Sequence, residues 1–151
     1  MIKGFFLIST NIIRVVVFLI VPVFLYYKNK ERLPTYLLSL LFVLSITYGL
    51  KYGLGIPRPE TAAWEVVTPR FPSGHTSMAF TPILFFKFWR YKILLLTYGF
   101  IIAYSRLYFN LHVPVDIVAS IVIGISIPLL FLRFEDRINQ KISSLTENRK
   151  V

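Results

Sequence analysis

The sequence lacks cysteine, and carboxylates and histidines are scarce among its 151 residues. Without cysteine no disulfide can form, so this residue type says nothing about the redox compartment. Seven acidic residues stand against 17 lysines and arginines, and they form no cluster that could hold a divalent cation. We therefore expect neither a metal nor a cofactor. Internal repeats and low-complexity linkers are also missing, which favours a single domain over residues 1–151.

The sequence also lacks the signs of three common alternatives. No small-residue cleavage site follows the N-terminal apolar run, so we do not expect a cleaved signal peptide. The net charge of +10 does not indicate a nucleic-acid partner, because the basic residues cluster between apolar segments instead of covering a soluble face. No feature predicts an obligate protein partner.

Apolar segments dominate the chain, which is 56% hydrophobic with a mean hydropathy of +0.65. Five runs are too long and too many for a soluble core: Phe5–Tyr27, Leu33–Leu50, Thr76–Trp89, Ile93–Tyr104 and Pro114–Leu132. The first, second and fifth are long enough, or nearly so, to cross the hydrocarbon core as helices, and the other two are short. The pattern predicts an all-α, polytopic transmembrane bundle with about five spanning helices.

Several other residues and segments carry weaker signals. Arg14 lies inside the first run, where an arginine is costly; it either faces a headgroup pocket or marks a short crossing that begins near the interface. Trp64 is expected to anchor a loop at the interface, and Glu60 and Glu65 are expected to be solvated. From Arg133 onward, apolar residues at helical spacing mix with cations, which predicts a helix on the membrane surface or a frayed polar tail.

Threading five crossings divides the loops into two sets. One set holds most of the cations, including those of Lys28–Arg32 and Lys87–Lys92 and those after residue 132. The other holds the N-terminus, Lys51–His75 and Ser105–Asp116. Short cytoplasmic loops are enriched in lysine and arginine, so the first set is expected in the cytoplasm. The second set is then expected at the outer or periplasmic face of the cytoplasmic membrane.

The segment Ser105–Asp116 holds Arg106, one of only two histidines and one of only two aspartates. If a helix starts near Pro114, His112 and Asp116 lie one turn apart on one face, where the carboxylate can orient the imidazole. A histidine held in this way beside an arginine suggests a nucleophile or base that acts on an anion. The alternative is that Arg106 and His112 only anchor a helix end at the lipid headgroups.

Two other segments on the same side carry cations and a helix start. Lys51 is expected at a helix end, and Arg58 in the glycine- and proline-rich loop that follows. Pro72-Ser73-Gly74-His75 precedes the third run, where Ser73 is a good N-cap and the free backbone N–H groups of the helix start can bind an anion. Taken alone, each feature is more often structural: a snorkelling cation or a helix cap.

Together, Lys51-x6-Arg58-Pro59, Pro72-Ser73-Gly74-His75 and Ser105-Arg106-x5-His112-x3-Asp116 resemble the three-part signature of the type 2 phosphatidic acid phosphatase superfamily. Every motif position is filled in order, and both histidines are used. Each fixed position reduces chance matches by roughly twentyfold, so the resemblance is specific. It departs in one respect: membrane members usually have six crossings, and five runs are found here. Either the first crossing is missing, which would place the N-terminus outside, or Phe5–Tyr27 contains a short extra element around Arg14.

The resemblance implies that His112 attacks phosphorus, that Asp116 sets the tautomer of His112, and that His75 protonates the leaving oxygen. It also implies a phosphohistidine intermediate that water cleaves. The implied phosphate-binding residues are Lys51, Arg58, Ser73, Gly74 and Arg106. Elementary chemistry supports this set, because three fixed cations can hold a phosphate dianion without a metal, and arginine suits bidentate contact with phosphate oxygens.

We therefore expect an integral membrane hydrolase that removes a terminal phosphate from a lipid. Candidate substrates are lipid A 1-phosphate, undecaprenyl diphosphate, phosphatidylglycerol phosphate and phosphatidic acid. The alternative is a phospholipid- or anion-binding or transport protein without turnover, but the His112–Asp116 pair has no use in mere binding. A haloperoxidase-like site would need vanadate and a soluble scaffold, against which the apolar runs argue.

Overall fold

The computed structural model describes residues 2–62 and 67–147, and the side chains of residues 2–11, 13, 14, 146 and 147 lie outside that description. The described residues form helices and no strand, as predicted. In chain order the helices are α1 (Ile2–Lys28), α2 (Arg32–Leu54), α3 (Gly74–Phe80), the 3₁₀ helix η1 (Thr81–Phe85), α4 (Trp89–Tyr108), α5 (Pro114–Arg133) and α6 (Glu135–Glu147). Trp64, Glu65 and the side chain of Arg14 lie outside that description, so the expectations for them stay predictions.

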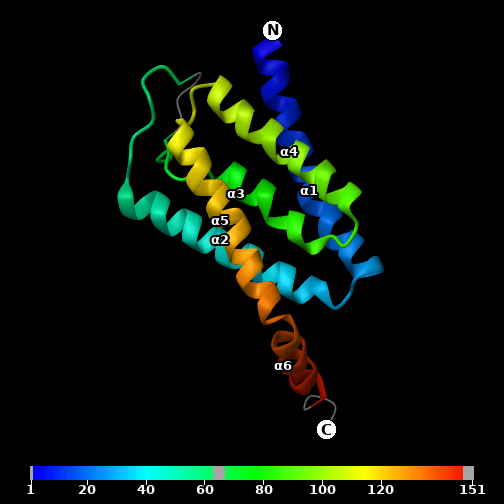
Figure 1. Ribbon diagram of the computed structural model, residues 1–151. Helices are drawn as coiled ribbons and strands as arrows, with labels where there is room; N and C mark the ends of the chain where they lie inside the picture. The colour runs from blue at the N-terminus through cyan, green and yellow to red at the C-terminus, as the bar shows by residue number, and fades with distance from the viewer. Residues whose placement is uncertain (1, 63–66, 148–151) are drawn as a thin grey trace.

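The long helices α1, α2, α4 and α5 run between two opposite ends of the bundle, and α6 projects beyond one of these ends (Figure 1). The end of α2 and the starts of α3 and α5 meet at one end, with the end of α4. At the other end, Arg32 at the start of α2 donates from Nη1 to the carbonyl of Phe85 at 3.1 Å and lies 3.8 Å from the carboxylate of Glu135. The two sets of loops predicted from the sequence therefore occupy opposite ends of the fold.

Two helix boundaries differ from the sequence prediction. The run Thr76–Trp89 is not one helix: α3 has seven residues and η1 five, and the chain is not helical from Phe86 to Phe88. Pro82 lies inside this run and cannot donate a helical hydrogen bond. With rises of about 1.5 and 2.0 Å per residue, α3 and η1 together reach about 20 Å, less than the hydrocarbon core.

The second run continues as a helix three residues beyond Lys51 and ends at Leu54. Gly55 follows with a φ of 59° in the left-handed region, and its N–H donates to the Lys51 carbonyl. Glycine adopts this conformation without steric cost and is the usual helix terminator. The predicted stop is therefore present, but one turn later.

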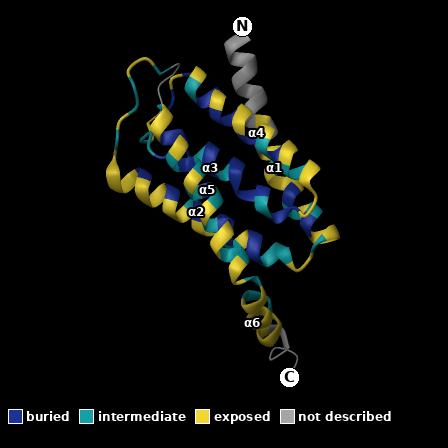
Figure 2. Cartoon of the chain, viewed as in Figure 1, coloured by how far each residue is buried: buried dark blue, intermediate teal, exposed yellow. Residues whose placement is uncertain are grey.

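Buried residues line the inner faces of the helices and exposed residues their outer faces (Figure 2). Many of the exposed residues are large and apolar, and several of the buried ones are small and polar. Leu41 on α2 is 57% exposed and Val122 on α5 is 58% exposed, whereas Ser39 and Ser120 on the same helices are fully buried. An aqueous protein rarely exposes so much apolar surface, but small polar residues between helices are typical of membrane proteins. By length and composition, α2 and α5 can cross a membrane.

Residues spaced four apart line the inner faces of α2 and α5. On α2 the buried stripe comprises Thr35, Ser39, Val43, Thr47 and Lys51, and on α5 it comprises Asp116, Ser120, Gly124 and Pro128. Residues four apart share one helix face, so each stripe forms a continuous contact surface. Below Asp116, the stripe on α5 thus consists of serine, glycine and proline. Each stripe ends in a charged residue, Lys51 or Asp116, at the same end of the bundle.

Gly124 allows α3 to lie against α5. A Cβ atom added at Gly124 would lie 2.5 Å from the carbonyl oxygen of Ser77 and 3.1 Å from the Cβ of Phe80. Backbone atoms cannot move aside as a flexible side-chain tip can. The approach of α3, and with it the position of its first residues, therefore depends on glycine at this point.

We predict that Gly124→Ala destabilises the protein, because overpacking of this kind typically costs about 1–3 kcal/mol. Gly49→Ala is the matched control, since a Cβ at Gly49 on α2 would meet no atom within 4 Å. Thermal unfolding in detergent, followed by circular dichroism, should give a lower midpoint for Gly124→Ala and an unchanged or higher one for Gly49→Ala. Equal midpoints would show that α3 does not pack on α5 as described.

Candidate active site

The connection between α4 and α5 positions His112. Asn110 follows α4 in a left-handed conformation with a φ of 52°, which asparagine tolerates better than most residues. The N–H of Leu111 then donates to the carbonyl of Arg106 at 3.0 Å and closes the helix end. α5 begins at Pro114, as predicted. His112 therefore lies in a short connection between two helices, where it is buried.

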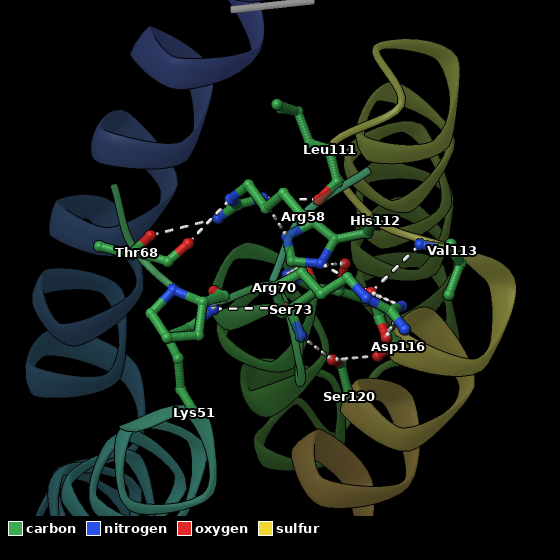
Figure 3. A network of polar contacts seen from close by, with 12 residues as sticks. Lys51, Arg58, Thr68, Arg70, Ser73, Leu111, His112, Val113, Asp116 and Ser120 are labelled. Carbon is green, nitrogen blue, oxygen red and sulfur yellow. Dashed lines mark hydrogen bonds and ion pairs between the residues drawn. The ribbon is translucent and has the colours of Figure 1, made fainter. Parts of the chain in front are cut away.

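Asp116 is fully buried and accepts hydrogen bonds from three groups (Figure 3). Its Oδ2 lies 3.2 Å from Nδ1 of His112 and accepts the Val113 backbone N–H at 3.1 Å. Nη1 of Arg70 lies 2.8 and 3.0 Å from the two carboxylate oxygens. Because a carboxylate only accepts, Nδ1 of His112 carries the ring proton and Nε2 keeps its lone pair. The predicted histidine–carboxylate contact is present.

Arg58 connects the loop after α2 to the connection that carries His112. Its Nη1 donates to the carbonyl of Leu111 at 2.6 Å and lies 3.4 Å from Nε2 of His112. On its other side, Nε and Nη2 donate to the carbonyl and the hydroxyl of Thr68 at 3.0 and 3.2 Å. A fixed cation therefore lies next to the histidine nitrogen that has the lone pair (Figure 3).

The environment of His112 keeps its ring neutral. Burial lowers the pKa of His112 from 6.5 to about 4, the cations of Arg58 and Lys51 act in the same direction, and Asp116 opposes them. Burial also lowers the pKa of Arg58. At neutral pH the ring of His112 thus combines an unprotonated Nε2 with a carboxylate at Nδ1, as a nitrogen nucleophile requires.

Lys51 reaches the site from the last turns of α2. Its ammonium is nearly buried and donates to the carbonyls of Pro69 and Arg70 at 2.6 and 3.2 Å. These bonds fasten the loop before α3 over the end of α2. An ammonium has three donors, so two carbonyls leave one for another acceptor.

Ser73 caps α3, as predicted, and is fully buried. Its hydroxyl accepts from the N–H and the hydroxyl of Thr76 at 3.4 and 3.0 Å. Its own N–H donates to Oγ of Ser120 at 2.7 Å, and Ser120 in turn donates to the carbonyl of Asp116 at 2.6 Å. Ser120 therefore joins the start of α3 to the first turn of α5, a link that the sequence motifs did not predict.

The other predicted residues lie on the elements that converge here. Gly74 and His75 are the first two residues of α3, and both are half-buried. Arg106 is buried in the last turn of α4, where its Nε donates to Oγ of Ser105 at 3.1 Å. The elements that carry the three sequence motifs thus meet at one end of the bundle.

The sequence analysis did not identify Arg70 or Thr68, because neither residue belongs to one of the three motifs. Arg70 pairs with Asp116 over 46 positions of the sequence, and Thr68 accepts from Arg58. A signal for Arg70 was available: Asp116 is the one aspartate on its side of the fold, and a buried carboxylate needs a donor of opposite charge. The cations of the facing loop were therefore candidate partners.

Comparison with known families shows to which superfamily the chain belongs. The family model of the PAP2 superfamily matches residues 32–140 and so covers all three motifs. The chain belongs to the PAP2 superfamily. This is the type 2 phosphatidic acid phosphatase superfamily that the motifs resemble. Membership assigns the chain to the phosphoric ester hydrolases, and the exposed apolar helices mark this PAP2 phosphatase as a membrane protein.

Two known proteins are similar to this chain. Undecaprenyl-diphosphatase BcrC of Bacillus subtilis (strain 168) is 38% identical over 68 residues, which are 44% of this chain and 35% of the length of that protein. The crystal structure of Aquifex aeolicus LpxE superposes with a TM-score of 0.76 at 26% sequence identity, covering 87% of this chain and 86% of that one. The helical arrangement is therefore shared with a solved structure over most of both chains.

The neutral state of His112 can be measured directly. We predict that its ring titrates near pH 4 and is neutral above that value, since the neutral fraction of a base grows as pH rises through its pKa. Arg58→Gln removes one cause of the lowered pKa, so its midpoint should move up toward 6.5. The titration can be followed by NMR of histidine-labelled protein in micelles, because the chain has only two histidine rings to assign. Arg90→Gln, at the opposite end of the fold, is the control and should leave the midpoint of His112 unchanged. A wild-type midpoint near 6.5 would contradict the described environment.

Proposed function

We propose that the chain removes a terminal phosphate from a membrane lipid through a phosphohistidine on His112, without a metal ion. The observation that carries this proposal is the position of the ring: Nδ1 of His112 lies 3.2 Å from Asp116, and Nε2 lies 3.4 Å from a guanidinium nitrogen of Arg58. Nε2 is thus a neutral, oriented nucleophile beside a cation that can contact phosphate oxygens.

The proposed reaction has two steps. In the first, Nε2 of His112 forms a bond to phosphorus while the bond from phosphorus to the lipid oxygen breaks, and His75 gives that oxygen a proton. In the second, water gives a proton to His75 and attacks phosphorus, so phosphate leaves and the imidazole is restored. Asp116 accepts from Nδ1 throughout and stabilises the positive charge that develops on the ring.

Charge complementarity supports phosphate binding at this site. Lys51, Arg58 and Arg106 supply three cations, and Ser73 and Gly74 at the start of α3 would contact a further oxygen. Cations fixed in advance stabilise the charge on the transferring phosphoryl group with little reorganisation. Arg58 suits this role because its guanidinium is already held by Thr68 and Leu111.

We also propose a substrate and a location. Undecaprenyl diphosphate is the first candidate, because the curated relative is named for it; phosphatidic acid, phosphatidylglycerol phosphate and lipid A 1-phosphate remain candidates from the motifs. We place residues 1–151 as one domain in the cytoplasmic membrane, with five crossings and α6 on the membrane surface. The site would face the exterior or periplasm, because the most basic loops lie at the opposite end.

The two histidines should differ in their dependence on the leaving group. Phosphate release by purified protein should be lost in His112→Ala on every substrate. His75→Ala should lose about a hundred- to ten-thousandfold on phosphatidic acid, whose alkoxide needs a proton to leave. It should lose far less on p-nitrophenyl phosphate or undecaprenyl diphosphate, whose leaving groups are weak bases. Asp116→Asn should be intermediate on all three.

This comparison also tests the proposal as a whole. Equal losses on all three substrates for His75→Ala would mean that His75 positions phosphate and donates no proton. Turnover by His112→Ala with the better leaving groups would contradict a phosphohistidine. If the wild type binds these lipids but releases no phosphate from any of them, the chain is a binding or transport protein.

Strong chelators should leave the wild-type rate unchanged, and vanadate should inhibit it.

The proposed orientation can be tested because the chain has no cysteine of its own. Lys30→Cys and Glu60→Cys each place one thiol at an exposed position, at opposite ends of the fold. An impermeant maleimide added to intact cells, or to spheroplasts where an outer membrane is present, should label Cys at position 60 and leave position 30 unlabelled. Both should react after detergent is added. The reverse pattern would place the site in the cytoplasm.

A further inference from the structure

Arg70 joins the loop before α3 to Asp116, the carboxylate of the third motif. Its Nη1 lies 2.8 and 3.0 Å from the two carboxylate oxygens of Asp116. Its backbone is held as well, since its N–H donates to the carbonyl of Ile56 at 2.9 Å and its carbonyl accepts from Nζ of Lys51 at 3.2 Å. The guanidinium is therefore fixed at its base and at its tip, and none of the three motifs contains it.

The position of this contact gives it a role in orienting His112. Asp116 can hold the imidazole only while its carboxylate keeps one rotation about the Cβ–Cγ bond. Val113 and His112 both bond to Oδ2, so neither of them engages Oδ1. Arg70 contacts both oxygens from the opposite element. With Arg70 in place, Oδ2 faces the ring; without it, one oxygen of a fully buried carboxylate loses its described partner.

We infer that Arg70 is a positioning residue, which acts through Asp116 to hold the imidazole of His112 in line for attack on phosphorus. This inference rests on the proposed function. Arg70 also balances the charge of Asp116, so that Lys51, Arg58 and Arg106 remain for the phosphate. Residues that orient metal ligands are typically worth about 10- to 100-fold in activity, and we expect an effect of the same order from a residue that orients a catalytic acid. Loss of the Arg70 side chain should lower kcat and leave KM nearly unchanged, because Arg70 forms an ion pair with Asp116 and does not contact the substrate.

A double-mutant cycle separates this role from a merely structural one. The variants are Arg70→Gln, Asp116→Asn and both together, assayed on p-nitrophenyl phosphate and on phosphatidic acid. Arg70→Gln should lower kcat about 10- to 100-fold in the wild-type background and change it little when Asp116 is already Asn. The backbone bonds of Arg70 persist in every variant, so the loop keeps its attachment to Lys51 and Ile56. Arg90→Gln, an exposed arginine at the other end, is the matched control.

Each outcome decides the inference. An equal loss from Arg70→Gln in both backgrounds, or no loss in either, would overturn it. Arg70→Lys keeps the charge and a donor nitrogen, so it should retain more activity than Arg70→Gln. Equal activities of these two variants would also overturn the inference, even if Arg70→Gln folds poorly. Full activity of Asp116→Asn alone would instead refute the proposed mechanism, because the acid itself would then be dispensable.

Discussion

The site depends on one buried carboxylate. Asp116 has no exposed surface. A buried carboxylate is stable only if hydrogen-bond donors or cations surround it. Its donors come from two separate parts of the chain: the connection that carries His112, and the loop that carries Arg70. Neither part alone satisfies the acid. The loop before α3 and the start of α5 therefore have to come together for the nucleophile to be oriented.

The rest of the fold provides the close approach that this requires. Small residues on α5 let α3 pack against it, and Ser120 bonds to both Ser73 and the carbonyl of Asp116. Deeper in the bundle, the hydroxyls of Thr47 and Ser77 lie 3.1 Å apart and join α2 to α3. Lipid gives little hydrophobic drive to helix association, so small and polar contacts of this kind hold such helices together. The packing that stabilises the bundle is also the packing that assembles the site.

Local features of this chain could be predicted from the sequence, and distant pairings could not. The cap of Ser73, the first-turn Pro114 and the contact of His112 with Asp116 each involve residues three or four apart, or one backbone position, and all are present. The pair Arg70–Asp116 spans 46 positions and depends on how α3 packs on α5. Pro82, which interrupts the run Thr76–Trp89, was visible in the sequence. A hydropathy pattern gives only the length of an apolar run, and it does not show that a proline lacks the N–H that a helix needs.

The contact between Arg58 and His112 bears on how such a site could be activated. In the proposed mechanism the lone pair of Nε2 must reach phosphorus, yet a guanidinium N–H lies 3.4 Å from it. A phosphate oxygen carries more negative charge than a neutral imidazole nitrogen and is the stronger acceptor for arginine. A bound phosphate would therefore draw the N–H of Arg58 away from Nε2 while the carbonyl of Leu111 keeps the guanidinium in place. Binding and activation of the nucleophile would then be one event, driven by the charge of the substrate.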